Sequence, residues 1–325
     1  MKRNVAYKPP FPWFGGKSPV AHYVWEAFGD VVNYVEPFFG SGAVLFLRPG
    51  GEGRIETVND ADGFVANFWR ALQCDCDAVA EHAEWPVNEA DLHARHLWLL
   101  GQREHLTDHL CGDPDFYDAK AAGWWCWGQC CWIGSGWCGG NGPWQSIDGV
   151  MGLRNTGQGV NRQLPHLGNT GRGEFLRSYL SEFAERLRNV RVCCGDWSRV
   201  CGPSVTFRHG MTGVFLDPPY ADTAERTDAL YATDCQQVAH EVREWAIEQG
   251  DNPLMRIVLA GYEGEHEMPA DWRVIEWEAT GGYSLIGDDD DAAGRANRKR
   301  ERLWCSPACL KNDRPIQRSL LEERS

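Results

Sequence analysis

The stretch TGVFLDPPY, residues 212–220, begins as a buried β-strand and ends abruptly. Its first residues are mostly apolar or β-branched, as in a strand that the protein interior covers. Pro218 and Pro219 then stop the strand, because neither proline has an N–H group for the backbone ladder. Two interpretations fit such an ending: a surface turn with an exposed tyrosine, or a catalytic loop at the carboxyl end of a parallel strand.

Six further segments have the same strand-like character, and helical patterns separate them. The predicted strands are short, rich in β-branched or aromatic residues and closed by polar or turn residues. Together with residues 214–217 they comprise 31–37, 54–58, 190–194, 255–260, 272–277 and 301–305. The predicted helices cover residues 18–28, 63–72, 174–188 and 235–249. Strands that alternate with helices predict an α/β, Rossmann-like fold, in which helices cover both faces of a mixed, mostly parallel seven-stranded sheet.

The alternation is interrupted between about residues 75 and 173. This segment holds a polar helical pattern followed by two glycine-rich stretches, and the first stretch carries Trp124, Trp125, Trp127, Trp132, Trp137 and Trp144. The glycines favour loops, and the tryptophans indicate that these loops pack or stack on something. We therefore predict one domain formed by residues 1–74 and 174–325, with residues 75–173 inserted between its two halves.

Length and composition exclude several classes of protein. The 325 residues contain no run of eighteen apolar residues and begin without the apolar core of a secretory signal, so we expect a cytoplasmic location. Without export, the thirteen cysteines do not indicate a disulfide framework. Four of them cluster without the C-x2-C spacing of a zinc site, which favours buried, reduced thiols and no metal: Cys126, Cys130, Cys131 and Cys138.

The net charge of −14 argues against a surface with positive potential throughout, but basic residues are concentrated locally. They gather in residues 1–20, 151–200 and 295–302. In residues 154–172 the arginines alternate with Gly, Asn, Gln and Thr instead of following one helical face. This pattern favours contacts with phosphates or bases over a solvated face, and the candidate residues are Arg154, Asn155, Arg162, Gln163 and Arg172.

The turn after the first predicted strand has the sequence EPFFGSGAV, residues 36–44. Gly40 and Gly42 permit a tight turn and a close approach of a ligand to the backbone. About twenty residues later the second strand ends at Asp60, where an acid can hold a ribose hydroxyl. These two features point to a cofactor that contains a nucleoside.

Acidic residues also follow the third and fourth predicted strands. Asp196 lies in the sequence CGDW, residues 194–197, and could accept a hydrogen bond from an adenine amino group while Trp197 lies on the ring. The alternative for Asp196 is a simple helix cap. Four successive strands thus end in Glu36, Asp60, Asp196 and Asp217, at the edge where open α/β sheets bind ligands.

The motifs FPWFGGK (residues 11–17), EPFFGSGAV, Asp60, CGDW and LDPPY occur in this order. Together they resemble the Dam-type (class alpha) S-adenosylmethionine-dependent DNA adenine-N6 methyltransferases, and ERLWCSP, residues 301–307, is similar to the last strand of phage-borne members. The resemblance covers roughly residues 9–72 and 174–306. It implies methyl transfer from S-adenosyl-L-methionine to the N6 amine of an adenine flipped out of double-stranded DNA. Residues 75–173 would then recognise DNA, with or without a specific site.

The predicted chemistry depends on the DPPY loop. Asp217 and the carbonyl oxygen of Pro218 would accept the two N6 hydrogens, so that the nitrogen lone pair points at the methyl group. The rigid prolines, Pro218 and Pro219, would hold these acceptors ready. Tyr220 would stack on the flipped base, which returns about 1–3 kcal/mol of the unstacking cost.

The resemblance also assigns residues to the cofactor. Trp13 would lie near its methionine end, where an aromatic face suits a sulfonium cation, and Lys17 near its carboxylate. Phe38 is either a cofactor contact or a core residue. For Trp13 the alternative is core packing, and for Lys17 a solvated loop. Two other functions remain open: a methyltransferase of the same fold acting on RNA adenine or cytosine N4, and a non-catalytic protein that binds a cofactor and nucleic acid.

Overall fold

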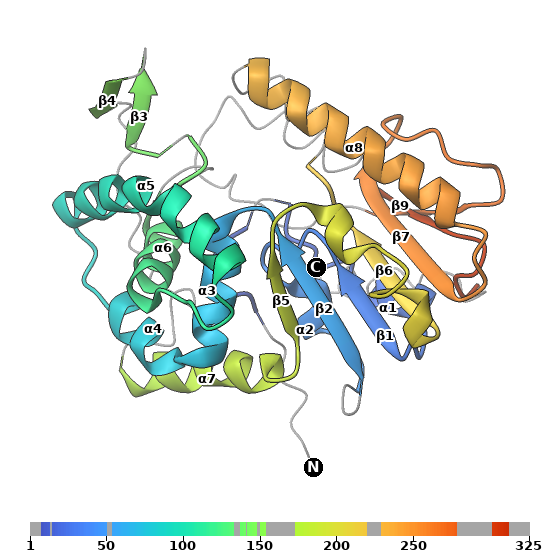
Figure 1. The fold of residues 1–325 in the computed structure, drawn as a ribbon, viewed down its shortest axis with the longest axis horizontal. Coiled ribbons are helices and arrows are strands. Elements are labelled where there is room, and N and C mark those ends of the chain that lie inside the picture. Colours follow the sequence, from blue (N-terminus) through green and yellow to red (C-terminus); the bar gives the residue numbers. More distant parts are fainter. Residues whose placement is uncertain are drawn as a thin grey trace, which may run out of the picture.

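The computed structural model describes residues 8–13, 15–50, 54–132, 137–140, 142–147, 150–153, 173–219, 229–277 and 301–311. Its centre is a seven-stranded sheet with the strand order β5-β2-β1-β6-β7-β9-β8 (Figure 1). The strands are β1 (Asn33–Glu36), β2 (Ile55–Asp60), β5 (Arg191–Cys194), β6 (Thr212–Leu216), β7 (Met255–Tyr262), β8 (Arg273–Glu276) and β9 (Glu301–Cys305). All seven predicted strands are present, and β6 starts two residues before the predicted segment.

Strand directions make the sheet mixed but mostly parallel. β5, β2, β1, β6 and β7 pair in parallel, whereas β9 runs antiparallel to both β7 and β8. The fold is therefore α/β and Rossmann-like, as the alternation of strands and helices predicted. Because the five parallel strands share one carboxyl edge, the segments that follow them are brought to the same end of the molecule.

The sheet is covered on both faces, which explains the near-continuous apolar character of its strands. Successive side chains of a strand point to opposite faces. Tyr34 and Phe215 accordingly belong to one buried apolar cluster, and their neighbours Val35 and Val214 belong to another. The first cluster includes side chains of α1 (Ala21–Phe28), α2 (Ala43–Phe46), α3 (Gly63–Cys74) and α7 (Glu174–Leu187), and the second includes side chains of α8 (Ala229–Gln249).

The predicted insertion is largely helical. It contains α4 (Cys76–Ala83), α5 (Glu89–Gly112) and α6 (Ala119–Cys131), followed by a hairpin of β3 (Trp144–Ile147) and β4 (Val150–Leu153). In Figure 1 these helices lie beyond the β5 edge of the sheet. Each helix begins at a side chain that accepts a hydrogen bond from the backbone of its first turn, namely Asp75, Asn88 and Asp118. Their apolar residues join the same cluster as α1, α2, α3 and α7.

The prediction that the first glycine-rich stretch forms loops was wrong for residues 123–131, which lie in α6. Gly128 is required there because a Cβ atom would lie 2.0 Å from Cε2 of Trp137. Gly123 is required because a Cβ atom would lie 2.5 Å from Cβ of His82. Trp125 and Trp127 are fully buried, so these tryptophans form core. The glycines of α6 thus serve close packing of a helix and not flexibility.

The clustered thiols are buried, as predicted. Cys126, Cys130, Cys131 and Cys138 are free cysteines with almost no exposed surface. Burial raises the pKa of Cys131 to about 12, so the group stays a thiol at neutral pH. Within the described part of the chain, no helix is long and apolar enough to cross a membrane.

Candidate active site

The candidate site lies at the carboxyl edge of the sheet, where β1 and β6 are neighbours. Val35 of β1 is paired with Val214 of β6, so the segments that begin at Glu36 and Asp217 emerge side by side. β2 lies on the far side of β1, and β7 lies on the far side of β6. The strand order thus reverses between β1 and β6, which is where open α/β sheets bind ligands.

Lys17 joins the N-terminal motif to the DPPY loop. Its Nζ atom lies 3.1 Å from Oδ1 of Asp217 and donates a hydrogen bond of 2.7 Å to the carbonyl oxygen of Gly15. The Lys17 side chain is buried, which contradicts the interpretation as a solvated loop residue, whereas the Asp217 side chain remains 21% exposed. Of the remaining loop residues, Pro218 is buried and Pro219 is exposed. Tyr220 lies outside the described residues.

A second carboxyl group, that of Glu301, faces the same ammonium group. Oε2 of Glu301 lies 3.9 Å from Nζ of Lys17. Burial raises the pKa of Glu301 to about 7, with Lys17 lowering it and Asp217 raising it. We did not predict Glu301 as a site residue. The only signal in the sequence was an acid at the first position of an otherwise buried strand, which does not reveal the partner.

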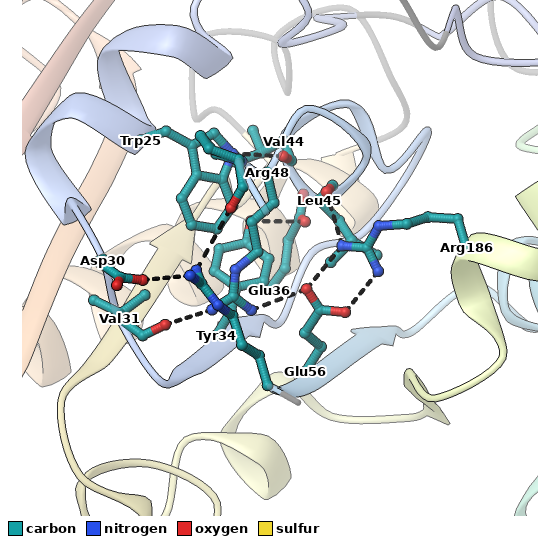
Figure 2. Close-up of polar contacts among 12 residues, drawn as sticks. Trp25, Asp30, Val31, Tyr34, Glu36, Val44, Leu45, Arg48, Glu56 and Arg186 are labelled. Carbon is teal, nitrogen blue, oxygen red and sulfur yellow. Dashed lines mark hydrogen bonds and ion pairs between the residues drawn. The ribbon is translucent and has the colours of Figure 1, made fainter. Parts of the chain in front are cut away.

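Glu36 is held by protein donors. The hydroxyl group of Tyr34 donates a hydrogen bond of 2.8 Å to Oε2 of Glu36, and the backbone N–H of Leu45 donates another (Figure 2). The carboxyl group is fully buried, and burial raises its pKa well above the ordinary value, with the charges of Asp217 and Asp60 adding to the effect. Glu36 therefore fixes the turn between β1 and α2. Tyr34 was not predicted as its partner.

The glycine turn is as tight as predicted. Gly40 and Gly42 adopt left-handed backbone conformations, with φ angles of +46° and +68°. The space next to Gly40 is taken by the indole ring of Trp13, since a Cβ atom would lie 2.5 Å from its Nε1 atom. At Gly42 a Cβ atom would meet the rings of Phe39 and Phe46. In this structure, protein side chains make the close approach that we predicted for a ligand.

Asp60 connects the glycine turn to the end of β2. Its Oδ2 atom accepts a hydrogen bond of 2.9 Å from the backbone N–H of Gly40, and its Oδ1 atom accepts one of 2.9 Å from the N–H of Asp62. Burial raises the pKa of Asp60 to about 7, although both hydrogen bonds lower it. The carboxyl group is therefore poised to ionise near neutral pH.

Asn59, which we did not predict, holds three strand ends together. Its side-chain amide donates to the carbonyl oxygens of Pro37 at 3.1 Å and Gly195 at 2.9 Å. These two residues follow β1 and β5, and Asn59 itself belongs to β2. A polar residue between Val58 and Asp60 at the end of a buried strand was the signal, but its partners are distant in the sequence.

The CGDW segment lies beside Phe38. Asp196 is exposed and caps the short 3-10 helix Trp197–Val200, accepting a hydrogen bond of 3.0 Å from the N–H of Ser198. The helix-cap contact that we considered for Asp196 is thus present. The rings of Phe38 and Trp197 are stacked with centroids 6.3 Å apart. Trp197 is buried, and Phe38 packs against the same cluster while remaining half-buried.

Trp13 lies at the surface of this edge and is 36% exposed. Its ring packs against Phe11 and Trp125, with centroids 5.8 Å and 6.3 Å away. Part of the ring thus packs on the core, as the alternative of core packing predicted. The other part is exposed, and its contact with a cofactor stays a prediction. The candidate nucleic-acid contacts lie outside the described residues: Arg154, Asn155, Arg162, Gln163 and Arg172.

An ion network around Glu56 joins β2 to neighbouring segments (Figure 2). Nη1 of Arg48 lies 2.9 Å from Oε1 of Glu56, and Arg186 of α7 donates to both oxygens of Glu56 at 2.7 Å. Arg48 also donates to the carbonyl oxygen of Val31 and lies over the ring of Trp25, 5.3 Å from its centroid. The network ties α7 and the segment after α2 to β2.

The N-terminal part of the chain is similar to a known family of enzymes. Residues 13–97 match the family model of the D12 class N6 adenine-specific DNA methyltransferases. The matched segment includes Trp13, Lys17, the glycine turn and Asp60, but it ends before Asp217. No curated protein matches the chain. The chain is thus similar to this class over about a quarter of its length, and that quarter carries the N-terminal half of the candidate site.

Proposed function

We propose that the protein is a DNA methyltransferase that moves a methyl group from S-adenosyl-L-methionine to the N6 amine of a flipped adenine. One observation carries the proposal: Lys17, inside the segment similar to adenine-N6 methyltransferases, lies 3.1 Å from Asp217 of the LDPPY sequence. Two motifs about two hundred residues apart in the sequence therefore meet at the point where the strand order reverses.

Asp217 is proposed as the acceptor for the substrate amine. Its carboxylate is held by a buried ammonium group on one side and is partly exposed, so that an incoming amine can reach it. The carbonyl oxygen of Pro218 is the proposed second acceptor. As the amine is methylated it becomes acidic, and its proton passes to a hydrogen-bond acceptor. Prolines after the acid limit reorganisation of the loop, which favours transfer. Tyr220 is the proposed stacking surface for the flipped base.

The residues at the neighbouring strand ends fit a nucleoside-containing donor. Asp60 offers a carboxylate for ribose hydroxyls, Asp196 an exposed carboxylate for an amino group, and Phe38 with Trp197 an aromatic surface. Trp13 lies beside Gly40 with part of its ring exposed, as a contact for a sulfonium centre requires. S-adenosyl-L-methionine would supply a methyl group on a positively charged sulfur. Glu36 and the two glycines would hold the turn that faces it.

A labelled-donor assay tests the function. The protein is incubated with S-adenosylmethionine carrying a labelled methyl group and with unmethylated DNA, RNA or free nucleosides, and the products are digested. We expect N6-methyladenine from DNA. Label in RNA adenine or in cytosine N4 would support the second function considered above, and donor binding without transfer to any substrate would support a non-catalytic protein.

We also propose a subfamily and a set of DNA contacts. We infer a Dam-type, phage-like member in which residues 75–173 contact double-stranded DNA, with Arg154, Asn155, Arg162, Gln163 and Arg172 as nucleic-acid contacts. The arginine pattern in the sequence supports this, whereas the buried tryptophans of α6 do not take part. Sequencing of methylated positions in a random DNA library tests it, because one enriched motif would exclude low specificity. A DNA substrate agrees with the cytoplasmic location expected from the sequence.

A further inference from the structure

We propose that Glu301 is a positioning residue of the transfer reaction, which acts through Lys17 on the acceptor Asp217. The inference rests on the proposed function and extends it to a residue of the last strand. Glu301 opens β9 and is paired with Tyr262, the last residue of β7. Because β9 runs antiparallel to β7, its first residue lies at the same edge as the carboxyl ends of the parallel strands.

Among the residues that the structure describes, the cation that faces Glu301 is Lys17. The residue is 6% exposed, and its Oε2 atom has no hydrogen-bond partner among the residues that the structure describes. The charged groups that act on it are Lys17, at 3.9 Å, and Asp217. The guanidinium group of the next residue, Arg302, is directed to Glu263 at 3.2 Å and to Glu276 at 3.9 Å instead. A buried acid is retained at a cost unless a charge compensates it.

One ammonium group therefore lies between two carboxyl groups. When Glu301 is ionised, it attracts Lys17 and weakens the hold of Lys17 on Asp217. Asp217 then becomes a stronger acceptor for the substrate amine. When Glu301 is protonated or replaced by an amide, Lys17 loses this attraction and is held more strongly by Asp217, so the acceptor weakens. Since the pKa of Glu301 is raised to about 7, this balance changes near neutral pH.

Kinetics give the first test. We expect Glu301→Gln to lower kcat about tenfold, with little change in the KM for the donor, because in this proposal Glu301 acts through Lys17 and not on the donor itself. The rise of kcat between pH 6 and pH 8 should flatten in the same variant. Glu301→Asp, which keeps the charge, should restore part of the pH dependence. Glu276→Gln removes an exposed acid from the neighbouring strand β8 and should behave like the unchanged protein.

A second measurement does not depend on activity. The protein is labelled with ¹³C-lysine, the Lys17 signal is assigned from Lys17→Arg, and its chemical shift is followed from pH 5 to pH 9. We expect a step near pH 7 that is lost in Glu301→Gln and kept in Glu276→Gln. A Lys17 signal without this step in the unchanged protein would overturn the proposal. If the step is present but no methyl transfer occurs, the coupling stands and the proposed function fails.

Discussion

Asp217 follows β6 and Asp60 ends β2, so both lie at the carboxyl edge of the sheet, but different groups contact their carboxylates. Asp217 faces the ammonium group of Lys17, whereas Asp60 accepts hydrogen bonds from the backbone N–H groups of Gly40 and Asp62. Both carboxylates are half-buried, but the first is compensated by a cation and the second takes its described contacts from backbone N–H groups. This difference suits an acceptor for the reacting amine at Asp217 and a ligand for neutral hydroxyl groups at Asp60.

Replacement of the acceptor should abolish most of the transfer. We expect Asp217→Ala to lower kcat by about 10²–10³-fold, the loss typical of one preorganised polar contact to a reacting group. Donor binding, measured by calorimetry, should change little. Asp251→Ala is a matched control, since Asp251 is exposed in the turn after α8. Activity of Asp217→Ala equal to that of the control would contradict the mechanism.

We expect Asp60 to make the binding of the proposed donor sensitive to pH. Its pKa of about 7 means that the ionised form increases from pH 6 to pH 8. Hydroxyl groups bind the ionised carboxylate better, so binding lowers the pKa and releases a proton. Affinity for S-adenosylmethionine should therefore rise about tenfold across this range. Calorimetry at several pH values checks this, and Asp60→Asn should remove the dependence. Equal slopes in both proteins would exclude a hydroxyl contact at Asp60.

At the scale of elements, α6 shows how close packing determines the use of glycine. We expect Gly128→Ala to destabilise the protein by about 1–3 kcal/mol, because its methyl group would overlap Trp137. Gly101→Ala in α5 is the matched control, since a Cβ atom there meets nothing within 4 Å. The control should be neutral or stabilising by up to about 1 kcal/mol. Denaturant unfolding measures both, and equal effects would contradict the packing argument.

The sequence predicted the strands better than it predicted the inserted region. Strands such as β6 and β7 are buried on both faces, so a local run of apolar residues is sufficient to identify them. The helix α6 was missed because its glycines are needed for packing against Trp137 and His82. Both residues lie outside the glycine-rich helical segment, so the local sequence does not reveal this need. Glu301 was missed for a similar reason, since its partner Lys17 lies at the other end of the chain.

At the scale of the whole molecule, one ion network connects segments of the sheet that lie on either side of the predicted insertion. Glu56 of β2 binds Arg48 from the first half and Arg186 of α7 from the second. Because the predicted insertion separates these segments in the sequence, the network links α7 to β2 across a long stretch of chain. The apolar cluster shared by α3, α4, α6 and α7 also joins these segments of the chain.

Loss of this central acid should therefore weaken the entire fold. We expect Glu56→Gln to lower the free energy of unfolding by about 3–5 kcal/mol, because the buried guanidinium group of Arg48 and the half-buried one of Arg186 lose their charge partner. Glu185→Gln, which breaks an exposed pair with Arg188, should cost less than about 1 kcal/mol. Thermal and denaturant unfolding measure both variants. A single cooperative transition with equal midpoints for the two would exclude a central role for the network.

The contact of Lys17 with Glu301 has a consequence for synthesis on the ribosome. The first of these residues is made early, and the second belongs to the last strand of the sheet. β8 is made before β9, although β9 is the strand with which it pairs. A nascent chain that ends before residue 301 therefore has its DPPY loop and its glycine turn but cannot complete the charge arrangement around Lys17. The site would reach its final state only when β9 has left the ribosomal tunnel.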